Sequence, residues 1–289
     1  MSRVVVLSYI PALLLNSCGR FYRPHGCTHN LSLTLPHLLP LSDYLPPVRS
    51  SRWPLMRQRW SNLLFAHWPV SPEVLRPYLP PRLELDLFDG QAWLGVVPFT
   101  MSHIRPLGLP AVPGLSALHE LNVRTYARLD GVPGVWFLSL DATQPLGVWA
   151  ARTLFHLPYL HARMQLTHTP DGTLHATATR THRSEPAATF AASWQPGAAL
   201  PLAQPNTLAH FLTERYHLYT AGHTVRAGQH GNSLWRGQLW HAPWALREAT
   251  LTRWESTLVE SHGLSTPAGP PLLHAADKLD VWVEELRRV

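Results

Sequence analysis

From Met56 onward, the chain is a series of short segments in which apolar and polar residues alternate, and this pattern limits the possible folds most strongly. Segment 118–128 is the clearest example. One alternating set consists of Glu120, Asn122, Arg124 and Tyr126, and the other consists of Leu121, Val123, Thr125 and Ala127. Successive side chains of a strand point to opposite faces, so this period of two predicts a strand. The polar set lies either inward, around a polar ligand, or outward, on a solvated face with Glu120 and Arg124 as a weak pair.

Similar segments predict further strands along the chain, at 60–69, 82–87, 92–99, 134–141, 161–167, 174–180, 187–194, 216–220, 234–241, 249–254 and 279–283. Asp-Gly pairs at 89–90, 130–131 and 171–172 predict tight turns. Short helices are expected over 71–78, 146–155 and 207–214, the last capped by Asn206. Residues 105–114, rich in Pro and Gly, are expected to form a loop. Because helices and strands do not alternate regularly, the pattern predicts one mainly β, mostly antiparallel, barrel-like domain.

Residues 1–55 differ from the rest in charge and contain both cysteines, Cys18 and Cys27. They contain five arginines and one acid, so the formal net charge of +6 falls to +2 (19 − 17) from Met56 onward. No Lys/Arg cluster with interleaved aromatic residues remains there, so nucleic-acid binding is not expected. The absence of cysteine after Met56 fits a reducing cytoplasm.

The apolar runs Val4–Leu7 and Ala12–Leu15 resemble a short signal-peptide core and are too short to cross a membrane. Residues 19–55 show no periodicity. Residues 1–55 are therefore interpreted either as a non-native upstream extension, translated from a misplaced start codon, or as an exported leader. Both readings leave residues 56–289 as the single folded domain.

Several runs of residues resemble known families. The runs 118–124, 135–141 and 151–160 resemble acetoacetate decarboxylases in order and spacing. Phe65-Ala66-His67-Trp68 and the runs 158–164 and 212–219 are similar to the YqjF-like proteins, an uncharacterised group in the acetoacetate-decarboxylase-like superfamily. The resemblance covers residues 56–289 and implies an acetoacetate-decarboxylase-like antiparallel β-barrel.

The resemblance stops short of the decarboxylase chemistry. Those enzymes form a Schiff base on a lysine that follows a proline, which lies six residues after an arginine. Arg152 and Pro158 keep this spacing, but Tyr159 and Leu160 come next, and the single lysine of the chain, Lys278, lies far along the sequence. A Schiff-base mechanism is therefore not expected.

The candidate site residues follow from the same resemblance. It aligns Glu120 with the active-site glutamate, and we assign catalytic roles to Glu120, Tyr159 and Arg152, the last as a carboxylate clamp. Ligand-binding roles go to Asn122, Arg124, His161 and Tyr216. Each has an ordinary structural alternative: packing for the tyrosines, an exposed position for Arg152, and a local ion pair for Glu214 and Arg215.

The sequence lacks the motifs that indicate other kinds of functional site. The chain has no HExxH motif, no Gly-rich phosphate loop and no Gly-x-Ser-x-Gly elbow, so no metal or cofactor is expected. The leading hypothesis is an enzyme that acts on a small carbonyl or carboxylate compound without a Schiff base. The alternative is a non-catalytic module, either a small-ligand binder or a structural barrel that forms homo-oligomers. The expected partner is a small molecule, with no membrane.

Overall fold

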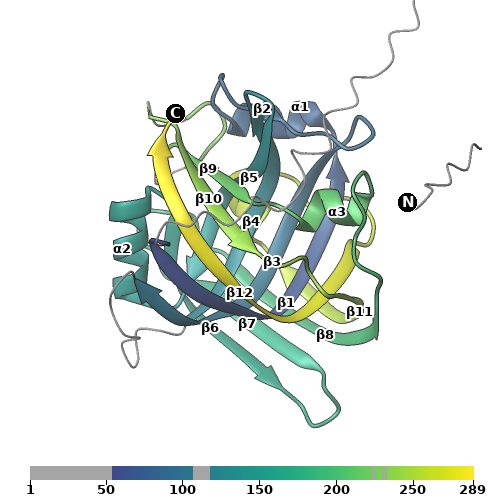
Figure 1. The fold of residues 1–289 in the computed structure, drawn as a ribbon. Helices are drawn as coiled ribbons and strands as arrows, with labels where there is room; N and C mark the ends of the chain where they lie inside the picture. The colour runs from purple at the N-terminus through teal and green to yellow at the C-terminus, as the bar shows by residue number, and fades with distance from the viewer. Residues whose placement is uncertain (1–53, 107–117, 223–224, 230, 232) are drawn as a thin grey trace, which may run out of the picture. The chain divides into compact units, whose positions relative to one another are not determined.

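The computed structural model describes residues 54–106, 118–222, 225–229, 231 and 233–289, which form a twelve-stranded sheet with a few short helices (Figure 1). The strands are β1 (Met56–Val70), β2 (Glu84–Leu85), β3 (Ala92–Pro106), β4 (Leu118–Leu129), β5 (Val132–Ala142), β6 (Tyr159–His168), β7 (Leu174–Arg180), β8 (Thr189–Ala199), β9 (His217–Thr220), β10 (Trp235–His241), β11 (Leu246–Ser256) and β12 (Leu272–Arg288). The helices are α1 (Pro72–Leu75), α2 (Pro145–Phe155) and α3 (Leu208–Thr213), with 3₁₀ turns η2 (Arg76–Tyr78) and η3 (Glu260–His262). The predicted mainly β fold with short helices is confirmed.

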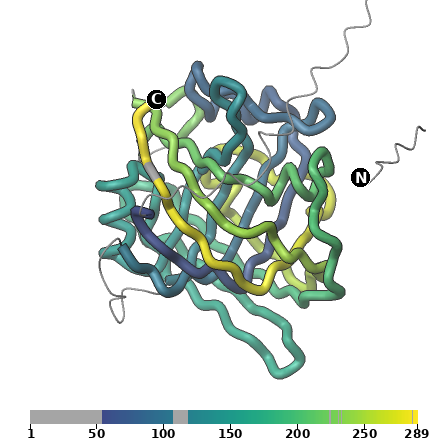
Figure 2. The backbone as a smooth tube through the Cα atoms, in the orientation of Figure 1, coloured from purple at the N-terminus to yellow at the C-terminus, as the bar shows by residue number. Residues whose placement is uncertain are grey.

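The sheet closes on itself twice. Its strand order is β10-β9-β5-β6-β7-β8-β11-β12-β1-β3-β4-β2, and the pairings β5–β4 and β10–β12 join strands that lie apart in this order. Figure 2 shows the second closure as the yellow β12 beside the green β10. One ring runs through β6, β7, β8 and β11, and the other through β9 and β10. Both rings share β12, β1, β3, β4 and β5, which we call the shared wall.

The shared wall is apolar on both faces because it separates two packed regions. Leu64 and Ala66 of β1 belong to the main core, on the face that also carries Leu121 of β4. Leu63 and Phe65 point the other way and join a second cluster. A strand buried on both faces reads as a continuous apolar run, as β1 does here. The polar residues of β4 lie on the second face, toward β9 and β10.

The predicted Asp-Gly turns are present at all three places. Asp89 and Gly90 have φ of 49° and 76°, and Asp130 and Gly131 have 50° and 82°. Two consecutive positive φ values are the requirement of a type I′ hairpin turn, which Asp-Gly satisfies. Gly172 also has a positive φ, 83°, in the turn between β6 and β7.

Three local expectations differ from the structure. Within 82–87, only Glu84 and Leu85 pair as a strand, against β4. Helix α3 is capped by the hydroxyl of Thr207, not by Asn206, which has a φ of 68°. The sheet is mostly antiparallel, as expected, and the exceptions are the parallel pairings of β5 with β6 and β9. The predicted loop at 105–114 lies outside the described residues after Pro106, which ends β3.

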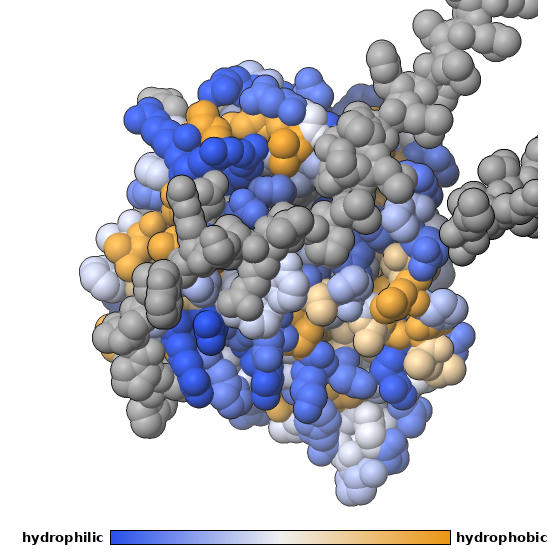
Figure 3. Space-filling model, viewed as in Figure 1, coloured by the Kyte–Doolittle hydropathy of each residue, from blue (hydrophilic) through white to orange (hydrophobic). Residues whose placement is uncertain are grey.

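Helix α2 packs through few residues and exposes several apolar side chains. Val148 is its buried residue, whereas Leu146, Trp149 and Leu154 are each at least 60% exposed. In Figure 3, apolar surface is visible at the side of the molecule where Figure 1 places α2. No helix among the described residues has the length and apolar character needed to cross a membrane.

Candidate functional site

Glu120 and Tyr159 form a short hydrogen bond next to the shared wall. The Tyr159 hydroxyl donates to Oε2 of Glu120 at 2.6 Å, and Nδ2 of Asn122 approaches Oε1 at 3.5 Å. Alternation along β4 puts Glu120 and Asn122 on one face, and the parallel β5–β6 pairing carries Tyr159 to them. Glu120 is 2% exposed, so the outward reading of this face does not apply.

Burial sets the protonation of this pair. It raises the pKa of Glu120 to about 7, and the hydrogen bonds from Tyr159 and Asn122 and the charge of Arg124 only partly oppose the rise. Burial, together with the charge of Glu120, also raises the pKa of Tyr159 well above its usual range. A carboxyl group with a pKa near neutrality can both take up and release a proton at physiological pH.

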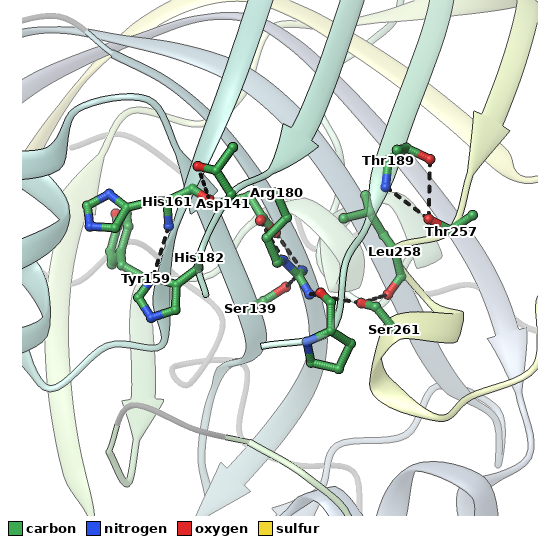
Figure 4. A network of polar contacts seen from close by, with 12 residues as sticks. Ser139, Asp141, Tyr159, His161, Arg180, His182, Thr189, Thr257, Leu258 and Ser261 are labelled. Atoms are coloured by element: carbon green, nitrogen blue, oxygen red, sulfur yellow. Dashed lines mark hydrogen bonds and ion pairs between the residues drawn. The ribbon is translucent and has the colours of Figure 1, made fainter. Parts of the chain in front are cut away.

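Arg152 and His161 lie near this pair without contacting the carboxylate. Nη1 of Arg152 donates to the backbone oxygen of Tyr159 at 2.6 Å, so the guanidinium fixes the start of β6. His161 stacks on His182 with ring centroids 5.4 Å apart, and its backbone N–H points to Nδ1 of His182 (Figure 4). The structure thus places both residues beside Tyr159, at the edge of the group.

Arg124 is a buried cation that forms no ion pair with a carboxylate of the described residues. Its side chain is on the same face of β4 as Glu120, and the residue is 8% exposed. Nη2 donates to the backbone oxygen of Leu212 at 3.2 Å and approaches the Tyr126 hydroxyl at 3.4 Å. Its Nε has no hydrogen-bond partner within the described residues.

The other buried arginines differ from Arg124 because each has a carboxylate partner. Arg128 and Arg215 both pair with Asp86, at 2.9 and 2.5 Å, and Arg180 pairs with Asp141 at 2.7 Å. Buried charges are normally paired in this way, since an unpaired one costs several kcal/mol. Arg124 forms no such ion pair in the part of the chain that the structure describes.

A hydrogen-bonded chain holds Arg124 in place. The Tyr126 hydroxyl donates its one proton to the backbone oxygen of Leu212 at 2.6 Å, so His67, at 2.7 Å, donates from Nε2 to Tyr126. His67 is fully buried, and its desolvation and the charge of Arg124 keep its pKa well below the usual range. His67 is therefore neutral and adds no repulsion to Arg124.

Arg124 lines a small cavity on the β9–β10 side of the shared wall, which we call the Arg124 cavity. Its volume is about 40 Å³, and residues of β1, β3, β4, β5, β9 and β10 contribute to its wall. Most of these side chains are apolar or aromatic, among them Trp60, Phe65, Val97, Phe137, Leu239 and Trp244. An apolar cavity with one or a few polar groups is the usual form of a small-molecule site.

Tyr216 and Glu214 lie behind the cavity wall. The Tyr216 hydroxyl donates to Oε2 of Glu214 at 2.7 Å, and the backbone N–H of Trp244 donates to Oε1 at 2.8 Å. The expected ion pair of Glu214 with Arg215 is wrong: Arg215 pairs instead with Asp86, which is 129 residues away in sequence. Tyr216 also stacks on His241, a residue of the wall, at 4.6 Å.

The polar network of Figure 4 is structural. Nε and Nη2 of Arg180 each donate to Asp141 at 2.7 Å, and Nη1 donates to Ser261 at 3.0 Å. Ser139 contacts Nε2 of His262 at 3.0 Å, but it is fully buried and Asp141 is engaged by Arg180. The network fastens η3 to β5 and β7 and lacks the third member of a nucleophilic triad.

Three of the groups that shape the site escaped sequence reasoning. His67 stands in the apolar run 63–68, and a polar residue inside such a run is the signal that marks it. Thr213 ends α3 and Arg215 lies in the connection to β9, and their position in the wall depends on tertiary packing. Lys278 is exposed on β12, opposite Ser61 of β1.

Solved structures of the same fold define the class of protein. The acetoacetate decarboxylase of Legionella pneumophila aligns with a TM-score of 0.52 at 14% identity, over 89% of this chain and 98% of that one. The enduracididine biosynthesis enzyme MppR, solved in complex with pyruvate, aligns with a TM-score of 0.56 at 14% identity, over 83% and 92%. The fold is therefore acetoacetate-decarboxylase-like, as the resemblance implied.

Sequence comparison then gives the family. The DUF2071 family, described as uncharacterized conserved proteins, matches residues 57–280. YqjF of Bacillus subtilis strain 168 is 41% identical over 234 residues, which cover 81% of this chain and 92% of that protein. The chain belongs to the DUF2071 family and is YqjF-like.

Proposed function

We propose that this protein binds a small carboxylate compound in the Arg124 cavity, with the Arg124 guanidinium holding the carboxylate. One observation carries the proposal: a buried cation lines a mostly apolar cavity and has no ion-pair partner within the described residues. A ligand carboxylate would balance this charge and could accept a hydrogen bond from the free Nε. This assignment gives the clamp role, first expected for Arg152, to Arg124.

The fold comparison supports this choice of ligand only by analogy. Pyruvate, which is bound in the MppR structure, is a small carboxylate. Fold alone does not fix function, so the charge balance around Arg124 remains the stronger support.

Calorimetric titration of the full chain with propionate tests the proposal. Arg124→Gln should weaken binding at least about tenfold, because it removes a charge-assisted contact. Arg152→Gln is the matched control, since Arg152 donates to a backbone oxygen. Equal affinity of the Arg124 variant and the unaltered protein would reject the role of Arg124, as would a loss in the Arg152 variant alone.

A second candidate function is proton transfer by Glu120, supported by its pKa of about 7 and its 2.6 Å bond from Tyr159. As a general base, Glu120 would remove a proton from the carbon next to a carbonyl group and return it as the acid. Tyr159 stands where the related decarboxylases have their lysine, so this chemistry needs no imine.

Exchange of the methyl protons of pyruvate for deuterium, followed by proton NMR, tests this second function. The protein should accelerate exchange, and Glu120→Gln should abolish the acceleration while leaving the near-ultraviolet circular dichroism unchanged. The exposed Glu84→Gln is the control. Exchange at an unaltered rate in the Glu120 variant would show that Glu120 is not the base.

A further inference from the structure

The charge balance of the Arg124 cavity limits the charge of its ligand. Two arginines line the cavity, but Arg215 is paired with Asp86 at 2.5 Å. Two histidines also line it; burial, aided by the charge of Arg236, lowers the pKa of His217 to about 4, and burial lowers that of His241. Arg124 is thus the one lining arginine that forms no ion pair with a carboxylate among the described residues, and it matches a ligand with a single negative charge.

Three polar groups of the wall are already engaged within the protein. Thr213 donates its hydroxyl proton to the backbone oxygen of Ala209 at 2.8 Å. Nδ1 of His241 lies 2.8 Å from the backbone oxygen of Ala242, and Nε1 of Trp60 donates to Gln58 at 2.8 Å. These donors are therefore not available to a hydroxyl or a second carboxylate on the ligand.

The remaining wall offers hydrocarbon contacts. Phe65, Val97 and Phe137 come from the shared wall and Leu239 from β10. The volume of about 40 Å³ leaves room for only a few ligand atoms beyond the carboxylate. A polar group in such a space would lose its water without gaining a partner.

From these observations we infer that the ligand is a monocarboxylate with a short hydrocarbon tail. This inference rests on the proposed function, since the carboxylate is the group held by Arg124. It adds that the wall selects against a second charge and against a hydroxyl group on the tail.

Calorimetric titration of the full chain, and of its Arg124→Gln variant, with a matched set of ligands tests the inference. Affinity should rise from acetate through propionate to butyrate by about fourfold per methylene, which corresponds to about 0.8 kcal/mol for each buried methylene. Succinate and 3-hydroxybutyrate, each of four carbons like butyrate, should bind at least about tenfold more weakly than butyrate. Butyramide, which has the same shape without the charge, should also bind at least about tenfold more weakly.

The possible results separate the inference from the proposed function. If succinate or 3-hydroxybutyrate binds as tightly as butyrate, and Arg124→Gln weakens all of them, the specificity inference is overturned and the carboxylate site stands. If butyramide binds like butyrate, or if none of the acids binds, both are overturned. A butyrate preference that disappears in Arg124→Gln supports both.

Discussion

Glu120 and Arg124 lie on the same face of β4, and each is buried without an ion pair among the described residues. Their chemical responses differ. The carboxyl group adapts by taking up a proton, since burial raises its pKa to about 7. A guanidinium has no such option and keeps its charge. Arg124 therefore stays charged, and the proposed anionic ligand would balance that charge, whereas Glu120 can become neutral by taking up a proton.

The raised pKa of Glu120 has a stability consequence with a definite sign. The folded protein holds this proton more tightly than the unfolded chain, so the contribution is complete below pH of about 4.5 and is lost as pH rises through about 7. Glu120→Gln should therefore gain stability relative to the unaltered protein between pH 5 and 8, by on the order of 3 kcal/mol. Urea unfolding at both pH values measures this. A stability difference that does not change with pH would contradict the assigned pKa.

The absence of a lysine near Glu120 gives a second prediction for single residues. Tyr159 and Leu160 follow Pro158, and Lys278 is exposed on another strand. Borohydride added with acetoacetate should therefore leave no covalent adduct on the protein. A peptide carrying a reduced imine at Lys278, detected by mass spectrometry, would refute this.

Sequence alone could place some site residues and not others, for a physical reason. The period of two put Glu120, Asn122 and Arg124 on one face. It did not reveal that this face is enclosed, because the enclosing strands β9 and β10 come about a hundred residues later. The pairing of Arg215 with Asp86 has the same origin: contacts distant in sequence leave no local signal.

Among the elements, β1 and β4 flank β3 on either side of Gly95. Gly95 faces Arg124 across the β3–β4 pair and His67 across the β1–β3 pair. A methyl group there would lie 2.9 Å from Cδ2 of His67 and 3.2 Å from Cγ of Arg124. Glycine thus makes room for the hydrogen-bonded chain that holds the guanidinium.

Gly95→Ala should therefore lower both stability and carboxylate affinity. Overpacking should cost about 1–3 kcal/mol in the free energy of unfolding, and displacement of Arg124 should weaken propionate binding. Gly147→Ala in α2 is the control, because its nearest neighbour would lie at 3.5 Å, an ordinary contact. Thermal unfolding and calorimetry measure both effects. Unchanged affinity in folded Gly95→Ala would argue against the positioning of Arg124 by this contact.

Turns could be predicted from the sequence where the residues of the turn itself determine its conformation. Asp130-Gly131 specified its turn because the two residues tolerate positive φ. The alternation in 82–87 predicted too long a strand, because only Glu84 and Leu85 pair with β4 as a strand. Helix α3 is capped by Thr207, whose hydroxyl accepts a hydrogen bond from the backbone N–H of His210 three residues later.

At the scale of the whole molecule, the closure of the ring through β9 and β10 forms the Arg124 cavity. The β10–β12 pairing and the parallel β5–β9 pairing place the cavity wall opposite β4. Neither pairing follows from hairpin patterns, because the strands are not neighbours in sequence. The class of fold was nonetheless accessible through the resemblance, which rests on residues spread across the whole domain.

Among the described residues, all twelve strands lie within 56–289. We therefore predict that a chain beginning at Met56 unfolds at the same temperature as the full chain, as measured by calorimetry. A substantially lower unfolding temperature would show that residues 1–55 contribute to the folded domain.

The central claim is that Arg124 is an uncompensated buried charge kept for an anionic ligand, and urea unfolding of Arg124→Met without and with butyrate tests it most directly. Without ligand, Arg124→Met should be more stable than the unaltered protein, by about 1 kcal/mol or more, whereas Arg180→Met, which breaks a buried pair, should lose about 3–5 kcal/mol. Butyrate should stabilise the unaltered protein and leave Arg124→Met unchanged. A loss in Arg124→Met as large as that in Arg180→Met, with butyrate stabilising both the unaltered protein and Arg124→Met, would contradict the claim.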